Sequence, residues 1–200
     1  MKNKLLKLSS LVLLLALMAQ GCTKDFEEIN TDPTAASADI YNPNYLLTRA
    51  QLGYMGSTDF AYETWRVNLI YCSTMMQHLS NVNGYWVGDK TRNNLGYENA
   101  YFERCYDEQV KYIVDCVEQT RGNAARSNVH NVARITRVLI FHRLTDLYGD
   151  VPYSQAGLGF YQQIYAPTYD AQADIYDNML RELEEASDAL DASGDPVTGD

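Results

Sequence analysis

Apolar residues recur along most of this chain at spacings of three and four, the period of an α-helix that buries one face. Runs that alternate between apolar and polar residues, as half-buried β-strands do, are almost missing. The pattern therefore predicts a mostly α fold. Its first clear stripe predicts a helix over residues 60–80, with a common face formed by Trp65, Leu69, Cys72, Met76 and Leu79.

The same period predicts three further helices, near residues 98–120, 128–148 and 171–190. The glycine of TRGN is expected to end the first of them, and Asp170 to cap the start of the last. Antiparallel helix pairs of this kind suggest tetratricopeptide-like hairpins, although that consensus is not visible letter by letter. The faces that define the helices are, in chain order, Tyr101, Cys105, Tyr112, Cys116 and Val117; Val132, Ile135, Leu139 and His142; and Ile175, Met179, Leu183, Ala186 and Leu190.

Residues 1–21 have the layout of a secretory signal peptide, because MKNKLLK carries three lysines and precedes SSLVLLLALMA, an apolar run too short to cross a bilayer comfortably. The following MAQGC resembles a lipobox, so Cys22 is expected to become a lipidated N-terminus that holds the protein to a membrane. An ordinary secreted protein with an incidental first cysteine is the alternative. Residues 22–44 are interpreted as a tether leading into irregular structure, and residues 45–200 as the helical domain.

The charge of the chain argues against one class of partner. Removal of residues 1–21 takes away three lysines and no acid, which changes the formal net charge from −10 to −13. Nucleic-acid binding needs clustered Lys and Arg, so no nucleic-acid partner is expected.

Three cysteines remain beside the lipidated one, an odd number that cannot pair fully within the chain. Cys105 and Cys116 lie eleven residues apart on one predicted helix, which separates them by about 16 Å. They cannot bridge each other, and buried free thiols are expected.

The stretch LTDLYGDVPYSQA, residues 144–156, crowds acids, tyrosines, a glycine and a proline at the end of a predicted helix. One interpretation is an active site in which paired carboxylates act as acid and base. The residues for those roles would be His142, Asp146 and Asp150, assisted by Tyr148 or Tyr153.

A structural corner explains the same stretch more simply. Asp146 is placed for a local ion pair with His142 or Arg143. Gly149 suits the left-handed residue beyond a helix end, and Pro152 prevents the helix from resuming. No catalytic residue is therefore assigned.

No metal or other cofactor is expected. The three histidines, His78, His130 and His142, are scattered, and neither HExxH nor CxxC occurs. Acids such as Asp32, Asp195 and Asp200 could contribute to a calcium site, but no EF-hand-like spacing supports one.

The better candidate for ligand contact is SNVNGYWVGDKTRNN, residues 80–94, between two predicted helices. Sugars are held by aromatic rings and by hydrogen bonds from polar and charged groups, and this loop offers both. The alternative is that the tryptophan pins the loop to the core. The candidate ligand-binding residues are Tyr85, Trp86, Arg92 and Asn94.

Other polar and aromatic groups are interpreted as structural. Most of the sixteen tyrosines, six of which fall between residues 148 and 176, are expected to pack their rings at helix edges. Glu182, Glu184 and Glu185 are expected to form a solvated helix face.

Several segments, in this order, resemble the N-terminal part of the SusD/RagB family: DFEEINTDP, NYLLTRAQ, RVLIFHRLTDLYGDVPYSQA, PTYDAQADIYDNMLRELEEA and SGDP. LTDLYGDVPYSQA and YDAQADIY are the most specific. Because family members are usually longer, the resemblance implies that a C-terminal part is missing here. The family-motif residues, given a structural role, are Asp146, Tyr148, Gly149, Asp150, Pro152 and Tyr153.

The resemblance implies a lipid-anchored protein of the outer membrane, facing the cell exterior of a Bacteroidetes-type bacterium. Such proteins are not enzymes; they bind a glycan, sometimes a peptide, and pass it to a SusC-like TonB-dependent barrel. Three alternatives stay open: a peptide-binding RagB-like lipoprotein, a helical-repeat adaptor without a small ligand, and a surface-anchored hydrolase.

Overall fold

The structure, a computed structural model, describes residues 41–56, 65–83 and 88–197. Contacts divide the chain into two compact units, Met1–Tyr41 and Asn42–Asp200, and every described helix belongs to the second. The signal peptide, Cys22 and Asp32 lie outside the described residues, as do Tyr85, Trp86 and Asp200.

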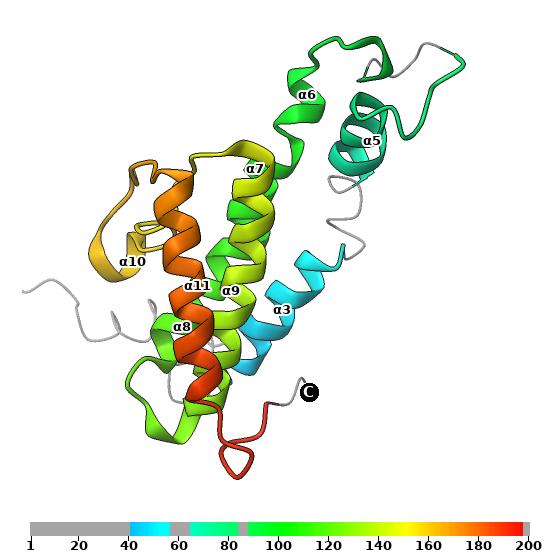
Figure 1. Cartoon of the computed structure of the whole chain (residues 1–200). Coiled ribbons are helices and arrows are strands. Elements are labelled where there is room, and N and C mark those ends of the chain that lie inside the picture. The colour runs from blue at the N-terminus through cyan, green and yellow to red at the C-terminus, as the bar shows by residue number, and fades with distance from the viewer. Residues whose placement is uncertain (1–40, 57–64, 84–87, 198–200) are drawn as a thin grey trace, which may run out of the picture. The chain divides into compact units, whose positions relative to one another are not determined.

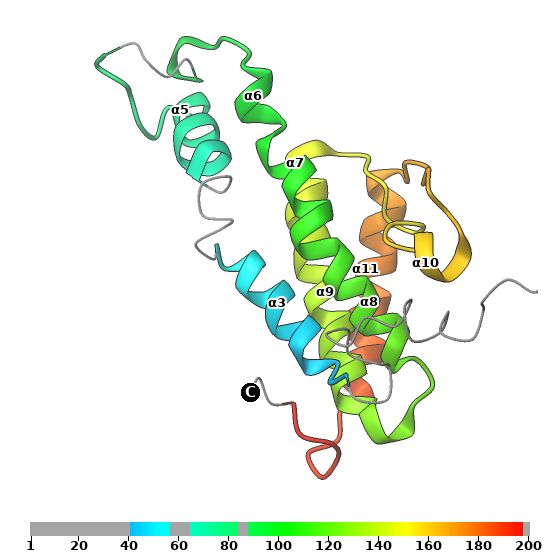
Figure 2. The same ribbon diagram turned by 180° about the vertical axis from the view of Figure 1, so that it is seen from behind.

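Long helices form the core of the Asn42–Asp200 unit. α7 (Ala100–Cys105), the π-helical η3 (Tyr106–Val110) and α8 (Lys111–Thr120) follow one another directly. α9 (Ser127–Tyr148) packs against α8 and α11 (Gln172–Asp188), and Figures 1 and 2 show it running alongside both. No β-strand occurs in the described residues, where Val151 and Asp170 form an isolated antiparallel bridge. The predicted mostly α, tetratricopeptide-like scaffold is confirmed.

The remaining elements are short. In chain order they are the π-helical η1 (Trp65–Cys72), α5 (Ser73–Met75), the 3-10 helix η2 (Gly88–Lys90), α6 (Leu95–Glu98), the 3-10 helix η4 (Ala124–Arg126) and α10 (Gly159–Gln162). Most of them lie where the sequence carries Gly, Asn and Ser in place of a long apolar stripe.

One helix, α3 (Asn44–Tyr54), is absent from the sequence-based prediction because it is too short for a clear period. It packs against α8, η3 and α9. The contact with η3 is close: a Cβ added at Gly53 would lie 3.0 Å from Cγ of Gln109, and the buried Gln109 amide donates to the Gly53 carbonyl over 3.2 Å. A glycine at this position lets the two helices approach.

The predicted helix limits hold for α7–α8, α9 and α11, but two predicted faces are wrong. In the first helix the predicted stripe is largely exposed, while Val67, Ile70 and Thr74 are buried. Both sets of residues satisfy the helical period, and the contacts of η1 with α6, α7 and η2 decide which is covered. The exposed fractions of the predicted residues are 39% for Trp65, 46% for Leu69, 68% for Met76 and 47% for Leu79.

The same reversal occurs in α9. The predicted stripe from Val132 to His142 is only half-buried or exposed, since α3, α8 and α11 cover other sides of this helix. The buried apolar residues of α9 are Val129, Ala133, Val138, Ile140, Phe141 and Leu144.

Candidate functional site

The helix end at the corner, residues 144–156, is built on Gly149. Its backbone has φ +74° and ψ −120°, so the expected positive φ is present, although ψ differs from the left-handed helical value. The Gly149 N–H donates to the Thr145 carbonyl over 2.7 Å, and the Thr145 hydroxyl donates to the Gly149 carbonyl over 2.7 Å. These two bonds satisfy backbone groups that a helix end otherwise leaves open.

Tyr148 ties the end of α9 to two other elements. Its hydroxyl donates to the Glu98 carbonyl over 2.7 Å and accepts from the Phe102 N–H over 3.1 Å. Burial raises the pKa of Tyr148, so the hydroxyl keeps its proton and remains a donor. The tyrosine thereby joins the last residue of α6 to the first turn of α7.

The carboxylate that caps the start of α11 is not the predicted one. The predicted cap, Asp170, makes no bond to this helix; it accepts from the Tyr153 and Ser154 N–H groups over 3.0 and 2.8 Å and from the Ser154 hydroxyl over 2.8 Å. Asp150 instead accepts from the Gln172 N–H over 2.9 Å. The corner therefore supplies the N-terminal cap of α11 in place of Asp170.

These contacts also set the charge state of Asp170. Burial acts to raise the pKa of its carboxyl, but the hydrogen bonds from Ser154 and Tyr153 outweigh burial, so the pKa lies below the ordinary value of 3.8. Asp170 therefore keeps its charge at neutral pH.

Asp146 lies on the exposed side of α9. Its carboxylate is 3.4 Å from Nε2 of His142 and accepts a hydrogen bond from the Tyr176 hydroxyl. The other candidate partner, Arg143, turns the opposite way: it donates to the Tyr54 carbonyl over 2.9 Å and stacks 4.0 Å from the centre of the Tyr54 ring. The acids proposed for an active site, Asp146 and Asp150, thus both make structural contacts.

Pro152 and Tyr153 anchor the far side of the corner. The Pro152 carbonyl accepts from the Tyr106 hydroxyl over 2.7 Å. The Tyr153 hydroxyl donates to Asn178 Oδ1 over 2.7 Å, and its ring packs edge-on against Phe141 with centres 4.8 Å apart. Burial is the largest reason that the pKa of Tyr153 is raised to about 12.

The prediction of a solvated glutamate face on α11 is wrong for one residue. Glu182 is only 6% exposed, and its carboxylate lies 2.6 Å from Arg137 and 3.4 Å from Arg134. Glu185 is exposed and lies 2.6 Å from Arg134, and Glu184 is exposed as expected. Sequence reasoning misses the burial of Glu182 because both arginines lie on another helix, α9.

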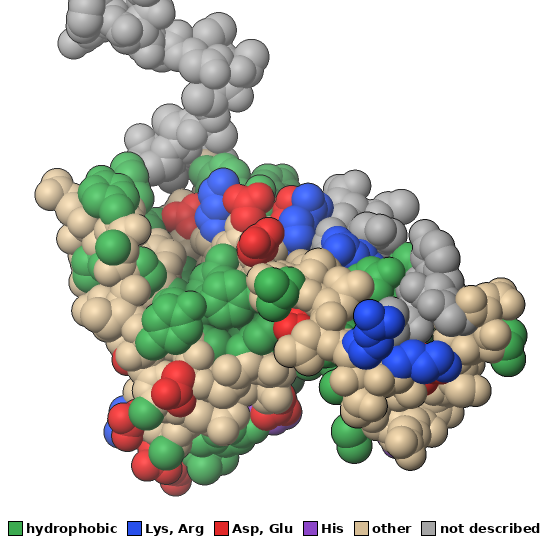
Figure 3. Space-filling model, turned by 90° about the horizontal axis from the view of Figure 1, so that it is seen from above, with side chains coloured by type: hydrophobic (Ala, Val, Ile, Leu, Met, Phe, Trp, Pro, Cys, Tyr) green, Lys and Arg blue, Asp and Glu red, His purple; other side chains and the backbone are tan. Residues whose placement is uncertain are grey.

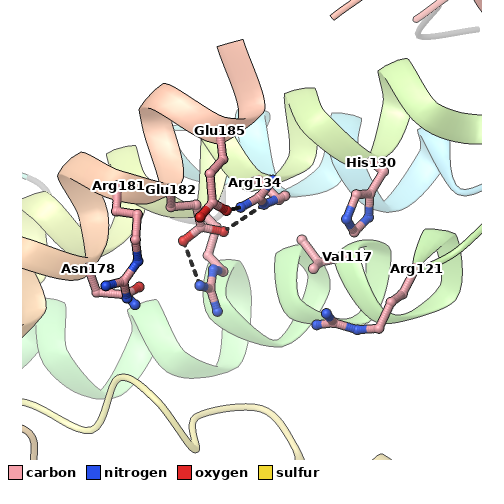
Figure 4. A pocket seen from close by; sticks show the side chains of 9 residues that line it. Val117, Arg121, His130, Arg134, Asn178, Arg181, Glu182 and Glu185 are labelled. Carbon is pink, nitrogen blue, oxygen red and sulfur yellow. Dashed lines mark hydrogen bonds and ion pairs between the residues drawn. The ribbon is translucent and has the colours of Figure 1, made fainter. Parts of the chain in front are cut away.

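A pocket of about 390 Å³ opens beside these ion pairs, between α8, α9 and α11 (Figure 4). We call it the basic pocket. Its lining is Val117, Arg121, His130, Arg134, Arg137, Asn178, Arg181, Glu182 and Glu185. The lining holds four arginines against two glutamates, an unusual balance in an acidic chain.

In the predicted ligand loop, residues 80–94, the described residues on either side of Tyr85 and Trp86 are anchored. The Asn81 N–H and the Lys90 ammonium bond to Asp89 Oδ2 over 2.9 and 2.8 Å, and these bonds, Lys90 first, lower the pKa of Asp89. A Cβ added at Gly88 would lie 1.9 Å from the Thr74 hydroxyl oxygen, so this glycine packs directly on α5.

The other two candidates in the loop differ from each other. Arg92 is exposed. Asn94 caps α6: its Oδ1 accepts from the Tyr97 N–H over 3.3 Å, while its own N–H donates to Glu98 Oε1 over 3.1 Å. Asn94 therefore holds the end of the loop to the scaffold.

The described cysteines are all free thiols. Cys105 and Cys116 are buried, and burial raises the pKa of each to about 12. Cys72 is only half-buried.

Asp195, one of the acids considered for calcium, accepts from the Asn128 and Val129 N–H groups over 2.7 and 3.2 Å at the start of α9. In the described ranges, no group of three or more His, Cys, Asp or Glu side chains is placed to hold a metal ion. None of the helices in those ranges is both long and apolar enough to cross a bilayer.

Part of the described surface is apolar. Figure 3 shows one face, on which hydrophobic side chains gather in a patch with acidic and basic side chains beside it. Large exposed side chains in the described part of the chain include Phe160, Tyr165 and Tyr169. Exposed apolar surface of this kind is typical of interaction sites.

Stacked helix pairs joined by hydrogen-bonded corners and polar, aromatic loops define a helical-hairpin scaffold protein. Within that class, the chain belongs to the SusD-like family, whose sequence model, described as "Starch-binding associating with outer membrane", matches residues 35–200. A comparison with curated proteins gives no match.

Two solved structures support the assignment. A chitin-binding protein is 39% identical with a TM-score of 0.67, and the match covers 80% of this chain and 33% of that protein. A protein named "Bacteroidetes AC2a SusD-like" is 29% identical with a TM-score of 0.66, and the match covers 80% of this chain and 29% of that protein. This chain therefore spans about a third of the length of the solved structures it matches.

Proposed function

We propose that this chain belongs to a cell-surface lipoprotein that binds a glycan and delivers it, without chemical change, to a SusC-like TonB-dependent transporter in the outer membrane. One observation carries the proposal: family membership over residues 35–200, together with 39% identity to a chitin-binding protein. Chitin or a related polysaccharide of amino sugars is accordingly the first glycan to test.

The loop of residues 80–94 is the proposed contact for that glycan. Tyr85 and Trp86 supply rings for stacking on the C–H faces of a sugar. Arg92 is exposed and free to donate to hydroxyl groups, and Asn94 holds the loop end by capping α6. Firm anchoring at Gly88 and Asp89 favours binding, because less conformational freedom is lost when the ligand is held.

The proposed membrane attachment is a lipid on Cys22, with the corner, residues 144–156, serving only the scaffold. The hydrogen bonds of Asp146 and Asp150 support a structural role for the corner. The phrase "associating with outer membrane" in the family description supports the membrane attachment. Replacement of Cys22 by Ser is expected to move the protein from the outer-membrane fraction to the soluble fraction. Retention of the Cys22→Ser protein in the membrane would contradict lipid anchoring.

Glycan binding is tested by depletion of the full chain from solution with insoluble chitin, starch and cellulose. We expect retention on chitin, no released sugar by chromatography, and a Trp86→Ala variant weakened about tenfold, since stacked aromatic rings contribute roughly 1 kcal/mol or more. Tyr165→Ala is the matched control, because it removes a ring that is 82% exposed on a different loop.

The outcomes separate the parts of the proposal. Release of sugar from every bound glycan overturns the non-enzymatic role. If Trp86→Ala binds chitin as well as the wild-type protein does while Tyr165→Ala loses binding, the loop of residues 80–94 is not the glycan contact. The proposed glycan-binding function would still stand.

A further inference from the structure

The basic pocket has an excess of positive charge that its own ion pairs do not consume. Four of the chain's ten arginines line it, whereas the formal charge of the whole chain is −10. Glu182 and Glu185 share the lining, and Arg121 pairs with Glu118 outside it, so one positive charge of the pocket has no ion-pair partner. A local excess of this sign draws anions toward the cavity.

The bonds of each arginine show where the excess lies. Arg134 is divided between Glu182 and Glu185, and Arg121 pairs with Glu118 outside the lining. Arg137 reaches Glu182 through one terminal nitrogen, while its buried Nε has no partner in the structure. Among the described residues, Arg181 makes no hydrogen bond or ion pair, so one exposed guanidinium of the lining remains available to a ligand.

The placement of these groups suits a ligand lying along the cavity. Figure 4 shows Arg181 beside Asn178 at one end and Arg121 beside Val117 and His130 at the other. Burial, followed by the nearby charges of Arg134 and Arg121, lowers the pKa of His130, so at neutral pH the imidazole is uncharged. His130 Nδ1 lies 3.0 Å from the Thr120 hydroxyl, which fixes the ring at the pocket wall.

The chemistry of the lining selects the class of ligand. Guanidinium groups bind planar carboxylates and other oxyanions through paired N–H donors, in a geometry that a neutral hydroxyl cannot match. The volume of about 390 Å³ falls within the range of about 300–1,000 Å³ typical of small-molecule sites. Val117 supplies one apolar contact in an otherwise polar lining.

We propose that the basic pocket binds the carboxylate of an acidic sugar, a hexuronic acid being the simplest example. Oxyanion binding follows from the pocket alone, whereas the choice of a sugar as its carrier rests on the proposed function. Arg181 is the expected donor, and the ion pairs of Glu182 with Arg134 and Arg137 hold the neighbouring side chains in place.

The test is calorimetric titration of the full chain at constant ionic strength with glucuronate, glucose, sulfate and phosphate. We expect binding of glucuronate and none of glucose, and a loss of about tenfold or more in Arg181→Gln, as for removal of a charged hydrogen-bond donor. The matched control is Arg126→Gln, which makes the same change of charge outside the lining. Thermal unfolding of both variants checks that the fold is retained.

Equal glucuronate affinity in Arg181→Gln and Arg126→Gln overturns the site, as does the absence of any response to the four probes. Binding of sulfate or phosphate without glucuronate overturns the acidic sugar as ligand. Chitin retention, measured separately, distinguishes this failure from failure of the proposed function, because Arg181→Gln is expected to leave chitin retention unchanged.

Discussion

Two regions of this molecule are held together in different ways. The long helices beside the corner, residues 144–156, bury large side chains. Phe141 is fully buried, and its ring packs edge-on against Tyr153 and Tyr106. The described part of residues 65–98 consists of short helical pieces, in which Val67, Ile70 and Thr74 are buried. Its other contacts include hydrogen bonds, such as the one from Tyr71 to Glu98, and the ion pair of Lys90 with Asp89.

The difference separates a rigid scaffold from a segment that carries the proposed ligand loop. Local stability follows the density of buried apolar contacts, so the corner is expected to open only with global unfolding. Residues 65–98 have fewer such contacts and are expected to open at lower free energy. Binding residues on loops held by a rigid scaffold are a common arrangement.

The largest expected effect is that of Phe141→Ala. Removing this ring leaves a cavity between α9 and its neighbours and is expected to lower the free energy of unfolding by about 3–5 kcal/mol. The measurement is urea-induced unfolding, monitored by circular dichroism. Phe160→Ala is the matched control, because Phe160 is 88% exposed and its loss is expected to cost less than about 0.5 kcal/mol.

A companion variant, Val67→Ala, extends the comparison to the other region. If residues 65–98 open independently, it will raise hydrogen exchange in that segment and change the global unfolding free energy little. A global loss as large as that of Phe141→Ala would show that the two regions unfold as one.

The limits of α8, α9 and α11 are predictable because the period and the breakers agree. Gly122, with φ +73°, follows α8, and Gly149 with Pro152 ends α9. Each signal lies within a few residues of the helix end it marks. Local chemistry is therefore enough to place these helices.

The covered faces of residues 65–75 and of α9, and the paired charges, depend on residues distant in sequence, and periodicity alone does not give them. Glu182 sits among other glutamates on α11, yet its partners Arg134 and Arg137 precede it by 48 and 45 residues. The cap of α11 shows the same limit, because Asp170 has the right local position but Asp150 makes the bond. The basic pocket combines three helices and has no local motif.

Gly88→Ala is expected to have a smaller and local effect. The new Cβ would overlap the Thr74 hydroxyl at 1.9 Å, so the loop must shift away from α5, at a cost of about 1–3 kcal/mol. Faster amide exchange at residues 73–79 and weaker chitin retention are expected, with little change around the corner. Gly96→Ala is the control, because its nearest neighbour, Asn94 Oδ1, would be 3.3 Å away. Equal exchange in both variants would contradict the anchoring role of Gly88.

The smallest effect concerns the charge of Asp170 and tests whether the corner depends on pH. The folded pKa of this carboxyl lies below 3.8, so its contribution to stability is present above the unfolded pKa and is lost as pH falls through the folded pKa. Asp170→Asn keeps one acceptor oxygen but loses the charge. We expect a cost of about 1 kcal/mol at pH 7, in line with the loss of charge-assisted hydrogen bonds from Ser154 and Tyr153.

The difference between the wild-type protein and Asp170→Asn isolates this group, because every other carboxyl titrates in both. The difference in unfolding free energy should shrink as pH falls below about 4, toward the range where the wild-type carboxyl is also protonated. Asp177→Asn, which makes the same change of charge at an exposed position on α11, is the matched control. A cost for Asp170→Asn that stays constant down to acidic pH would assign its contribution to shape and hydrogen-bond geometry instead of charge, and the corner would then be as insensitive to pH as its buried rings.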